Sequence, residues 1–163
     1  MNKWMIGILC GVIGAGLGLG VAVGIKTNYL AQTLEKKSEQ ADKYNELFQL
    51  MNQWVRLKQK GKTLIEYFEE KGYRQIAIYG MNFAGETLVN ELEDSSVCVK
   101  YGIDKDAKHI MASCNMITPD EVFEEVDAIV VTPVYYYSQI ADLIEKRVSC
   151  PVISLEDIIY ETL

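Results

Sequence analysis

The sequence predicts an α/β protein whose small, doubly wound and mostly parallel sheet has five strands. Short apolar segments alternate with helical ones, and segment 127–132 is nearly continuously apolar, as strands buried on both faces are. N-terminal to the strands in the sequence, an uncharged segment predicts a transmembrane helix, and a 3.5-residue repeat after it predicts a helical stalk. The expected domains are a membrane anchor at 1–27, an amphipathic stalk helix at 28–60 and the α/β domain at 61–163.

The charge of the chain argues against one class of partner. The 163 residues include 16 Lys and Arg against 23 Asp and Glu, a formal net charge of −7, and most of the acidic residues lie in the expected α/β domain. Nucleic-acid binding depends on clustered Lys and Arg, so no nucleic-acid partner is expected. The four cysteines form no C-x-x-C pair and the single histidine is His109, so no metal site is expected either.

The N-terminal segment predicts a membrane anchor. Trp4 to Ile25 contains no charged residue, and a helix of this length spans roughly 33 Å, enough for a bilayer core. A cleaved signal peptide is the alternative, but this segment is longer than the usual apolar region and no clear cleavage site follows it. Lys26 and the stalk lysines place the globular domain on the cytoplasmic side, as a single-pass protein of the cell membrane.

Two features could bring two copies of the chain together. Closely spaced glycines give G-x-x-x-G pairs such as Gly14/Gly18, which allow membrane helices to dimerise, although glycine is common in such helices. In the stalk, apolar residues recur at steps of four and three from Leu30 to Val55, with only Lys37 out of the pattern. We expect a stalk whose distal end packs onto the α/β domain; a coiled-coil homodimer is the alternative.

The segment after the stalk is a helix start rather than a phosphate loop. Residues 61–63 match the end of a P-loop motif, but Arg56 stands where the first glycine is required, and a helix precedes the motif. Thr63 and Glu66 instead predict a capping box, in which each side chain satisfies a free amide of the helix start. The helix that follows is expected to stop near Gly72.

The next segments have the order of a mononucleotide-binding βαβ unit, which makes the domain Rossmann-like. A strand at 75–79 is followed by the turn Gly80–Gly85, a helix at 86–92, a strand at 97–103 and the acidic residue Asp104. Further strands are expected at 115–117, 127–132 and 152–155, with helices opening at 118, 136 and 156.

The turn and the acidic residue are candidate ligand contacts. Gly80 permits the tight turn and Gly85 lets the helix close against the strand, so that helix-start amides could face a pyrophosphate. Asp104 could accept hydrogen bonds from ribose hydroxyls. Asn82 occupies the middle glycine position, where its side chain would take part of the pyrophosphate space, and Phe83 follows it. A ligand-free βαβ unit with a tight turn is the alternative.

Thr132 and Tyr135 extend the candidate site. They lie at the carboxyl end of a central strand, where open α/β sheets bind ligands. The tyrosines at 135–137 could stack on a base or sugar, or simply cap the sheet. No lysine stands four residues after any of them, as short-chain dehydrogenases require, and no general base with a positioned partner is found. Cys98, inside a predicted strand, is expected to be buried.

Seven segments together resemble a group of bacterial proteins. They are Gln53–Trp54, Lys58–Lys62, Tyr67–Phe68, Gly72–Tyr73, Ile76–Gly80, Gly102–Asp104 and Ile153–Asp157. From about Gln49 onward the chain looks like Rossmann-like modules associated with cell-surface polysaccharide gene clusters of Gram-positive gut bacteria. It is more loosely similar to the nucleotide-sugar-binding N-terminal domain of bacterial sugar acyltransferases.

The resemblance implies binding of a nucleotide or nucleotide-sugar in envelope polysaccharide synthesis. It carries over Gly80, Gly85 and Asp104 as ligand contacts, while Asn82 departs from the usual glycine. The cofactor is not identified; a nucleotide-sugar or NAD(P) fits the pattern, and no independent catalytic activity is expected. The alternatives are a structural or adaptor protein with a degenerate nucleotide-binding fold and, less favoured because hydride-transfer groups are lacking, an NAD-dependent oxidoreductase or epimerase.

Overall fold

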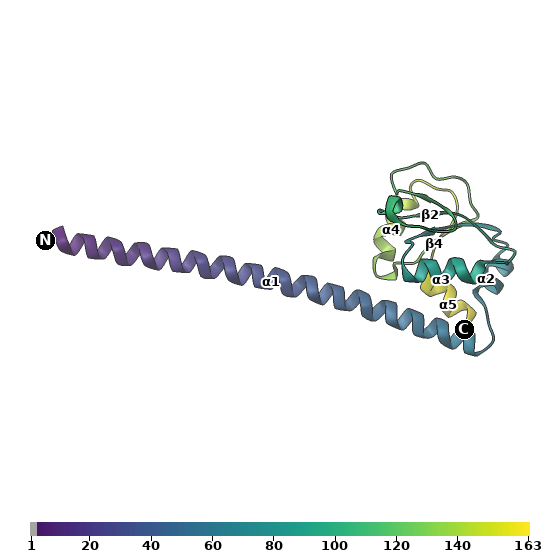
Figure 1. Ribbon diagram of the computed structural model, residues 1–163, viewed down its shortest axis with the longest axis horizontal. Helices are drawn as coiled ribbons and strands as arrows, with labels where there is room; N and C mark the ends of the chain where they lie inside the picture. The colour runs from purple at the N-terminus through teal and green to yellow at the C-terminus, as the bar shows by residue number, and fades with distance from the viewer. Residues whose placement is uncertain (1–2) are drawn as a thin grey trace. The chain divides into compact units, whose positions relative to one another are not determined.

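A computed structural model describes the backbone of residues 3–163 and the side chains of residues 28–163 (Figure 1). Contacts divide the chain into two compact units, Met1–Lys43 and Tyr44–Leu163, and helix α1 (Lys3–Gln59) contributes to both. The predicted transmembrane helix and its glycine pairs lie outside the residues with described side chains. From residue 28 onward, no helix is both long and apolar enough to cross a membrane.

The unit Tyr44–Leu163 is built on a five-stranded sheet. All four strand pairs are parallel, so the sheet is wholly rather than mostly parallel, and its order is β3-β2-β1-β4-β5. The order reverses between β1 and β4, which are neighbours in the sheet but far apart in the sequence. The strands are β1 (Gln75–Tyr79), β2 (Cys98–Ile103), β3 (Asn115–Ile117), β4 (Ala128–Val131) and β5 (Val152–Ser154).

Helices cover both faces of the sheet because side chains alternate along each strand. Ile76 and Ile78 of β1 join the core layer that includes the end of α1 and the helices α2 (Leu64–Lys71), α3 (Phe83–Leu92) and α5 (Leu155–Thr162). Ala77 and Tyr79 join the opposite layer, which α4 (Tyr137–Ile144) completes. Figure 1 shows α3 and α5 together on one side of the sheet.

The end of α1 belongs to the core of this unit. Leu50, Trp54 and Leu57 are buried, with at most 4% of each side chain exposed. They join the core layer of α2, α3 and α5. The expectation that the distal end of the stalk packs onto the α/β domain is confirmed.

Helix α2 begins at Leu64 as predicted, but its predicted capping box and the helix predicted to open at Thr118 do not form. Thr63 precedes α2 but makes no side-chain capping hydrogen bond, and the amide of Leu64, the first residue of the helix, donates to Glu91 of α3 at 2.7 Å. No helix opens at Thr118, since the described residues 118–126 form turns and irregular structure. There the carboxylate of Glu121 accepts from the amide of Thr118 at 2.7 Å and closes a turn.

Candidate functional site

A cavity of about 440 Å³ opens at the carboxyl ends of β1, β2 and β4. It lies beside the reversal of strand order, which is where open parallel sheets form a ligand crevice. Residues that follow each of these strands line it, together with the exposed face of α4. The lining residues are Tyr79, Gly80, Asn82, Asp104, Lys105, Asp106, Pro133, Tyr136, Gln139, Ile140 and Leu143.

The floor of the cavity is a turn that requires glycine. Gly80 has φ +95°, and a Cβ there would lie 2.7 Å from Cδ of Pro133 and 2.8 Å from Oγ1 of Thr132. The buried hydroxyl of Thr132 donates to the carbonyl of Gly80 at 2.5 Å, and its amide donates to the carbonyl of Tyr79 at 3.0 Å. Thr132 therefore fixes the turn from behind rather than facing the cavity.

Helix α3 starts against the same turn. A Cβ on Gly85 would lie 2.2 Å from the carbonyl oxygen of Gly80, so only glycine allows the helix to approach the strand this closely. Asn82 precedes the helix with φ −100°, an ordinary extended conformation, and lines the cavity. Phe83 is 69% exposed and is not among the lining residues, so its ring does not fill the hollow.

Asp104 connects the end of β2 to the turn. One carboxylate oxygen accepts from the amide of Met81 at 3.0 Å and the other from the amide of Asp106 at 2.9 Å. An ionised carboxylate offers about four acceptor positions, so each oxygen retains one for a ligand hydroxyl. The same contact removes the Met81 amide from the donors that could meet a phosphate.

Of the seven predicted contact residues, some line the cavity and others do not. Gly80, Asn82 and Asp104 line the cavity, whereas Gly85 and Thr132 are buried behind the turn. Phe83 and Tyr135 do not line it, and Tyr136 does so in place of Tyr135. The 3₁₀ turn η2 (Val134–Tyr136) between β4 and α4 decides which tyrosine faces the hollow.

Sequence reasoning missed several lining residues. Lys105 and Asp106 directly follow the predicted acidic residue at the end of β2, so their position along the chain was a usable signal. Gln139, Ile140 and Leu143 recur with helical spacing on α4 and line the hollow as one face. That face could be assigned only once the helix start was known.

Burial raises the pKa of one residue that lines the cavity and of two cysteines outside it. Burial, with a further contribution from the Asp104 carboxylate, raises the pKa of Tyr79, so this phenol stays neutral at physiological pH. Burial likewise raises the pKa of the Cys114 and Cys150 thiols, which makes them weaker nucleophiles. Within residues 28–163, no three His, Cys, Asp or Glu side chains are grouped so that they could hold a metal ion.

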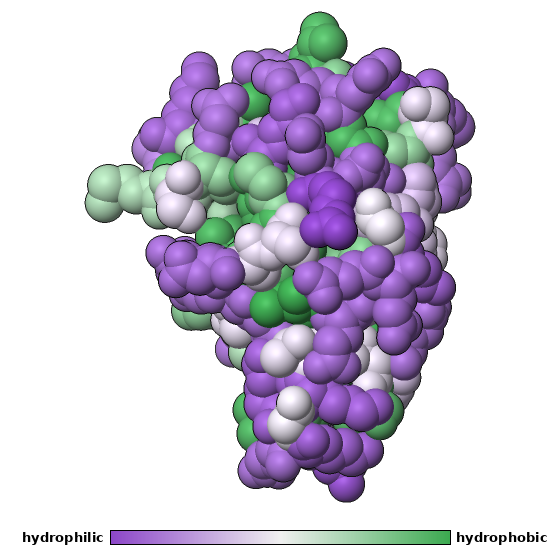
Figure 2. Space-filling view, turned by 90° about the vertical axis from the view of Figure 1, so that its right-hand side faces the viewer, coloured by the Kyte–Doolittle hydropathy of each residue, from purple (hydrophilic) through white to green (hydrophobic). Residues whose placement is uncertain are grey.

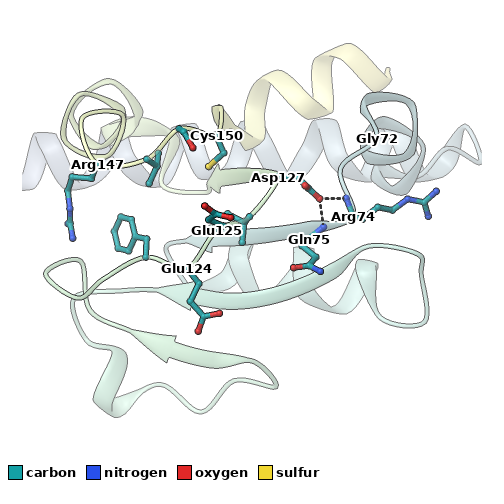
Figure 3. Close-up of a pocket in the computed structure, with 12 residues that line it drawn as sticks. Gly72, Arg74, Gln75, Glu124, Glu125, Asp127, Arg147 and Cys150 are labelled. Carbon is teal, nitrogen blue, oxygen red and sulfur yellow. Dashed lines mark hydrogen bonds between the residues drawn. The ribbon is translucent and has the colours of Figure 1, made fainter.

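A larger hollow of about 730 Å³ lies at the opposite, amino-terminal end of the strands (Figure 3). Two of its charged side chains bind the main chain. Asp127 accepts from the amides of Arg74 and Gln75, and Arg147 donates to the carbonyl of Glu121 at 2.7 Å while its guanidinium stacks 4.4 Å from the ring of Phe123. In the smaller cavity the Asp104 carboxylate retains acceptor capacity, which makes that cavity the candidate ligand site.

Asp127 predicts how stability depends on pH. Hydrogen bonds from the amides of Gln75 and Arg74 hold the pKa of its carboxyl below the ordinary value. Such a group stabilises the fold above its unfolded pKa of about 3.9, and this contribution is lost as pH falls through the lower folded value. We expect the free energy of unfolding to fall between roughly pH 5 and pH 2, and to fall less steeply in Asp127→Asn.

Urea unfolding followed by circular dichroism at each pH checks this expectation. Asp142→Asn is the matched control, because Asp142 is an exposed aspartate on α4. Its pH dependence should equal that of the unsubstituted chain. Equal slopes for all three proteins would contradict a stabilising role for the Asp127 carboxylate.

Comparison of the chain with protein-family models, with curated protein sequences and with solved structures gives no match.

Proposed function

We propose that this protein is a membrane-anchored, Rossmann-like module that binds a nucleotide or nucleotide-sugar in the cavity at the carboxyl ends of β1, β2 and β4. The observation that carries the proposal is the Asp104 carboxylate, which lies at the end of β2 on the cavity wall with acceptor capacity to spare. A role in cell-surface polysaccharide biosynthesis rests on the sequence resemblance. Anchoring rests on the uncharged segment from Trp4 to Ile25.

The polar half of the cavity favours hydroxyl groups. Asp104 and Asp106 contribute two carboxylates against the single ammonium group of Lys105. Vicinal ribose or sugar hydroxyls are donors that match the unused acceptor positions of Asp104. A phosphate would instead lie toward the start of α3, where main-chain amides and the positive end of the helix dipole favour an anion.

The opposite wall suits a flat, partly apolar group. Tyr136, Ile140 and Leu143 line this side, with Pro133 at its edge. The ring of Tyr136 is held edge-to-face against Tyr135, with 5.0 Å between their centroids. A nucleobase could therefore pack on a wall formed by α4 while its ribose reaches β2.

One observation favours the adaptor alternative. The amide of Met81 is already bonded to Asp104, so the turn has one donor fewer for a pyrophosphate. Under this alternative the turn is only a structural link between β1 and α3, and the chain holds partner proteins without a nucleotide. Ligand titration separates the two functions.

Isothermal titration of the full chain in detergent tests the proposal. We expect saturable heat with uridine or adenine nucleotides, or with a UDP-sugar, at up to millimolar concentration. Gln139→Trp should weaken this binding about tenfold or more, because Gln139 is an exposed lining residue and the indole would occupy the cavity. Asp142→Trp, on the same helix but outside the lining, should bind as the unsubstituted chain does.

Two results would contradict nucleotide binding at this site. One is the absence of saturable heat for every nucleotide tested. The other is equal affinity of Gln139→Trp and the unsubstituted chain, which would place any binding elsewhere.

A further inference from the structure

An apolar stripe on α1 lies outside the core of the α/β unit. Within the unit Tyr44–Leu163, Tyr44, Phe48 and Val55 are 61%, 68% and 53% exposed. On the same segment, the face formed by Leu50, Trp54 and Leu57 is fully used by the core. The stripe is therefore a second apolar face of the helix, and the α/β unit leaves it uncovered.

The spacing of the stripe is that of a heptad repeat. Phe48 and Val55 are seven residues apart and take position a, while Tyr44 and Met51 take position d. Met51 is half-buried at the border between the stripe and the core, against which it also packs. In the unit Met1–Lys43, Leu34 fits a and Leu30 fits d, and they are 67% and 50% exposed. Scattered exposed apolar residues need no partner, and those on the face in Figure 2 form only small, separate areas. A row of exposed apolar residues at heptad spacing is instead typical of a helix that packs against a partner helix.

The charges favour a second copy of the same helix. From residue 44 to the end of α1 the charged side chains are Glu46 at f, Arg56 at b and Lys58 at d. Glu46 lies on the side away from a partner helix, and Arg56 lines the groove described below. Lys58 is paired with Glu91. The flanking e positions hold Asn45 and Asn52, so identical helices would meet without like-charge repulsion at that flank. Lys37 at d, in the other unit, has a flexible stem that can carry its ammonium group to water.

The surface of α1 also has a groove that a partner helix can occupy. A groove of about 440 Å³ is lined by Phe48, Met51, Asn52 and Val55, with Arg56 and Gln59 at its end. The first four are successive a, d, e and a positions. In knobs-into-holes packing each core side chain enters a hole of four residues on the facing helix. In a parallel, in-register pair, this hole receives Met51 of the second copy.

We infer that the protein forms a homodimer in which the α1 helices of two copies pack as a parallel, in-register coiled coil along this stripe. The dimer does not depend on nucleotide binding, since none of the groove residues lines the ligand cavity.

Sedimentation equilibrium of the full chain in detergent micelles tests the inference. The unsubstituted chain should be a dimer at micromolar concentration. Phe48→Glu should weaken the dimer about 100-fold or more, because two carboxylates would face each other in an apolar seam. Gln49→Glu adds the same charge one residue along, at an exposed position off the stripe, and should leave the dimer intact. Circular dichroism should show both variants folded, since Phe48 is exposed.

Disulfide crosslinking tests the direction of the helices. Two a positions face each other only in a parallel, in-register pair, so Val55→Cys should crosslink under mild oxidation. Glu46→Cys, at the outer f position, should stay at the background set by the natural cysteines of the unsubstituted chain. A monomeric full chain, a Phe48→Glu variant that remains dimeric, or equal crosslinking at positions 46 and 55 would each overturn the inference.

Discussion

Glu91→Ala is expected to lower the free energy of unfolding by about 3 kcal/mol. The Glu91 side chain is only 5% exposed and joins three separate elements. One oxygen accepts from the indole N–H of Trp54 at 2.6 Å, and the other accepts from the amide of Leu64 at 2.7 Å and pairs with Nζ of Lys58 at 2.6 Å. Alanine would leave the Trp54 and Leu64 donors without an acceptor, whereas the more exposed Lys58 could turn to water.

Urea unfolding followed by circular dichroism measures this loss. Asn90→Ala is the matched control, because Asn90 is the preceding residue of α3 and is exposed. It should change stability by about 0.5 kcal/mol or less. Glu91→Gln, which keeps one acceptor oxygen but loses the charge, should fall between the two. If Glu91→Ala were as stable as Asn90→Ala, the carboxylate would not be what holds α1 and α2 to α3.

Glu91 also shows why part of the fold could not be predicted. The sequence predicted that Thr63 caps α2 through Glu66, which is the local solution to the free amides of a helix start. The structure uses a carboxylate 27 residues away, because packing of α3 beside α2 brings that carboxylate to the Leu64 amide. The Leu64 amide is one that a capping box leaves without an acceptor, and sequence spacing does not reveal that Glu91 supplies it.

The strands were predictable where local chemistry fixes them. The limits of β1 and β3 agree with the expected 75–79 and 115–117, since an apolar β-rich segment and a breaker define each end. Cys98 was expected to be buried and is exposed, because it is the first residue of β2, whose burial begins only toward its carboxyl end. Helical periodicity predicted the second half of α1, and its widened apolar face predicted that this half packs onto the α/β domain.

The candidate site was predictable only as a set of positions along the chain. The glycine turn and Asp104 follow strands that had to be neighbours, so sequence order alone brought them together. The choice between Tyr135 and Tyr136 depends on the short η2 turn, whose geometry shifts the facing side chain by one residue. The bond from the Met81 amide to Asp104 was also beyond prediction, because it depends on the orientation of one peptide group.

Gly85→Ala is expected to destabilise the α/β unit by about 3 kcal/mol and to abolish the nucleotide binding that we propose for the cavity. The added Cβ would lie 2.2 Å from the Gly80 carbonyl oxygen, a main-chain atom that the hydroxyl of Thr132 holds in place. The helix must then move away from the strand, taking the helix-start amides and Asn82 with it. In an unconstrained helix, replacing glycine by alanine stabilises the helix by about 1 kcal/mol. A loss of stability in Gly85→Ala would therefore show that the close contact outweighs this gain.

Gly102→Ala provides the comparison that isolates the main-chain contact. A Cβ there would lie 2.5 Å from Sδ of Met116 and 2.8 Å from Cγ of Met81, both in flexible side chains that can shift. We expect a smaller loss of about 1 kcal/mol, with the turn and its binding retained. Urea unfolding and nucleotide titration of both variants provide the measurements. Two results would show that the close approach of α3 to β1 is not what shapes the site. One is a Gly85→Ala protein that is more stable than the unsubstituted chain. The other is a loss in free energy of unfolding for Gly85→Ala that is no larger than the loss for Gly102→Ala.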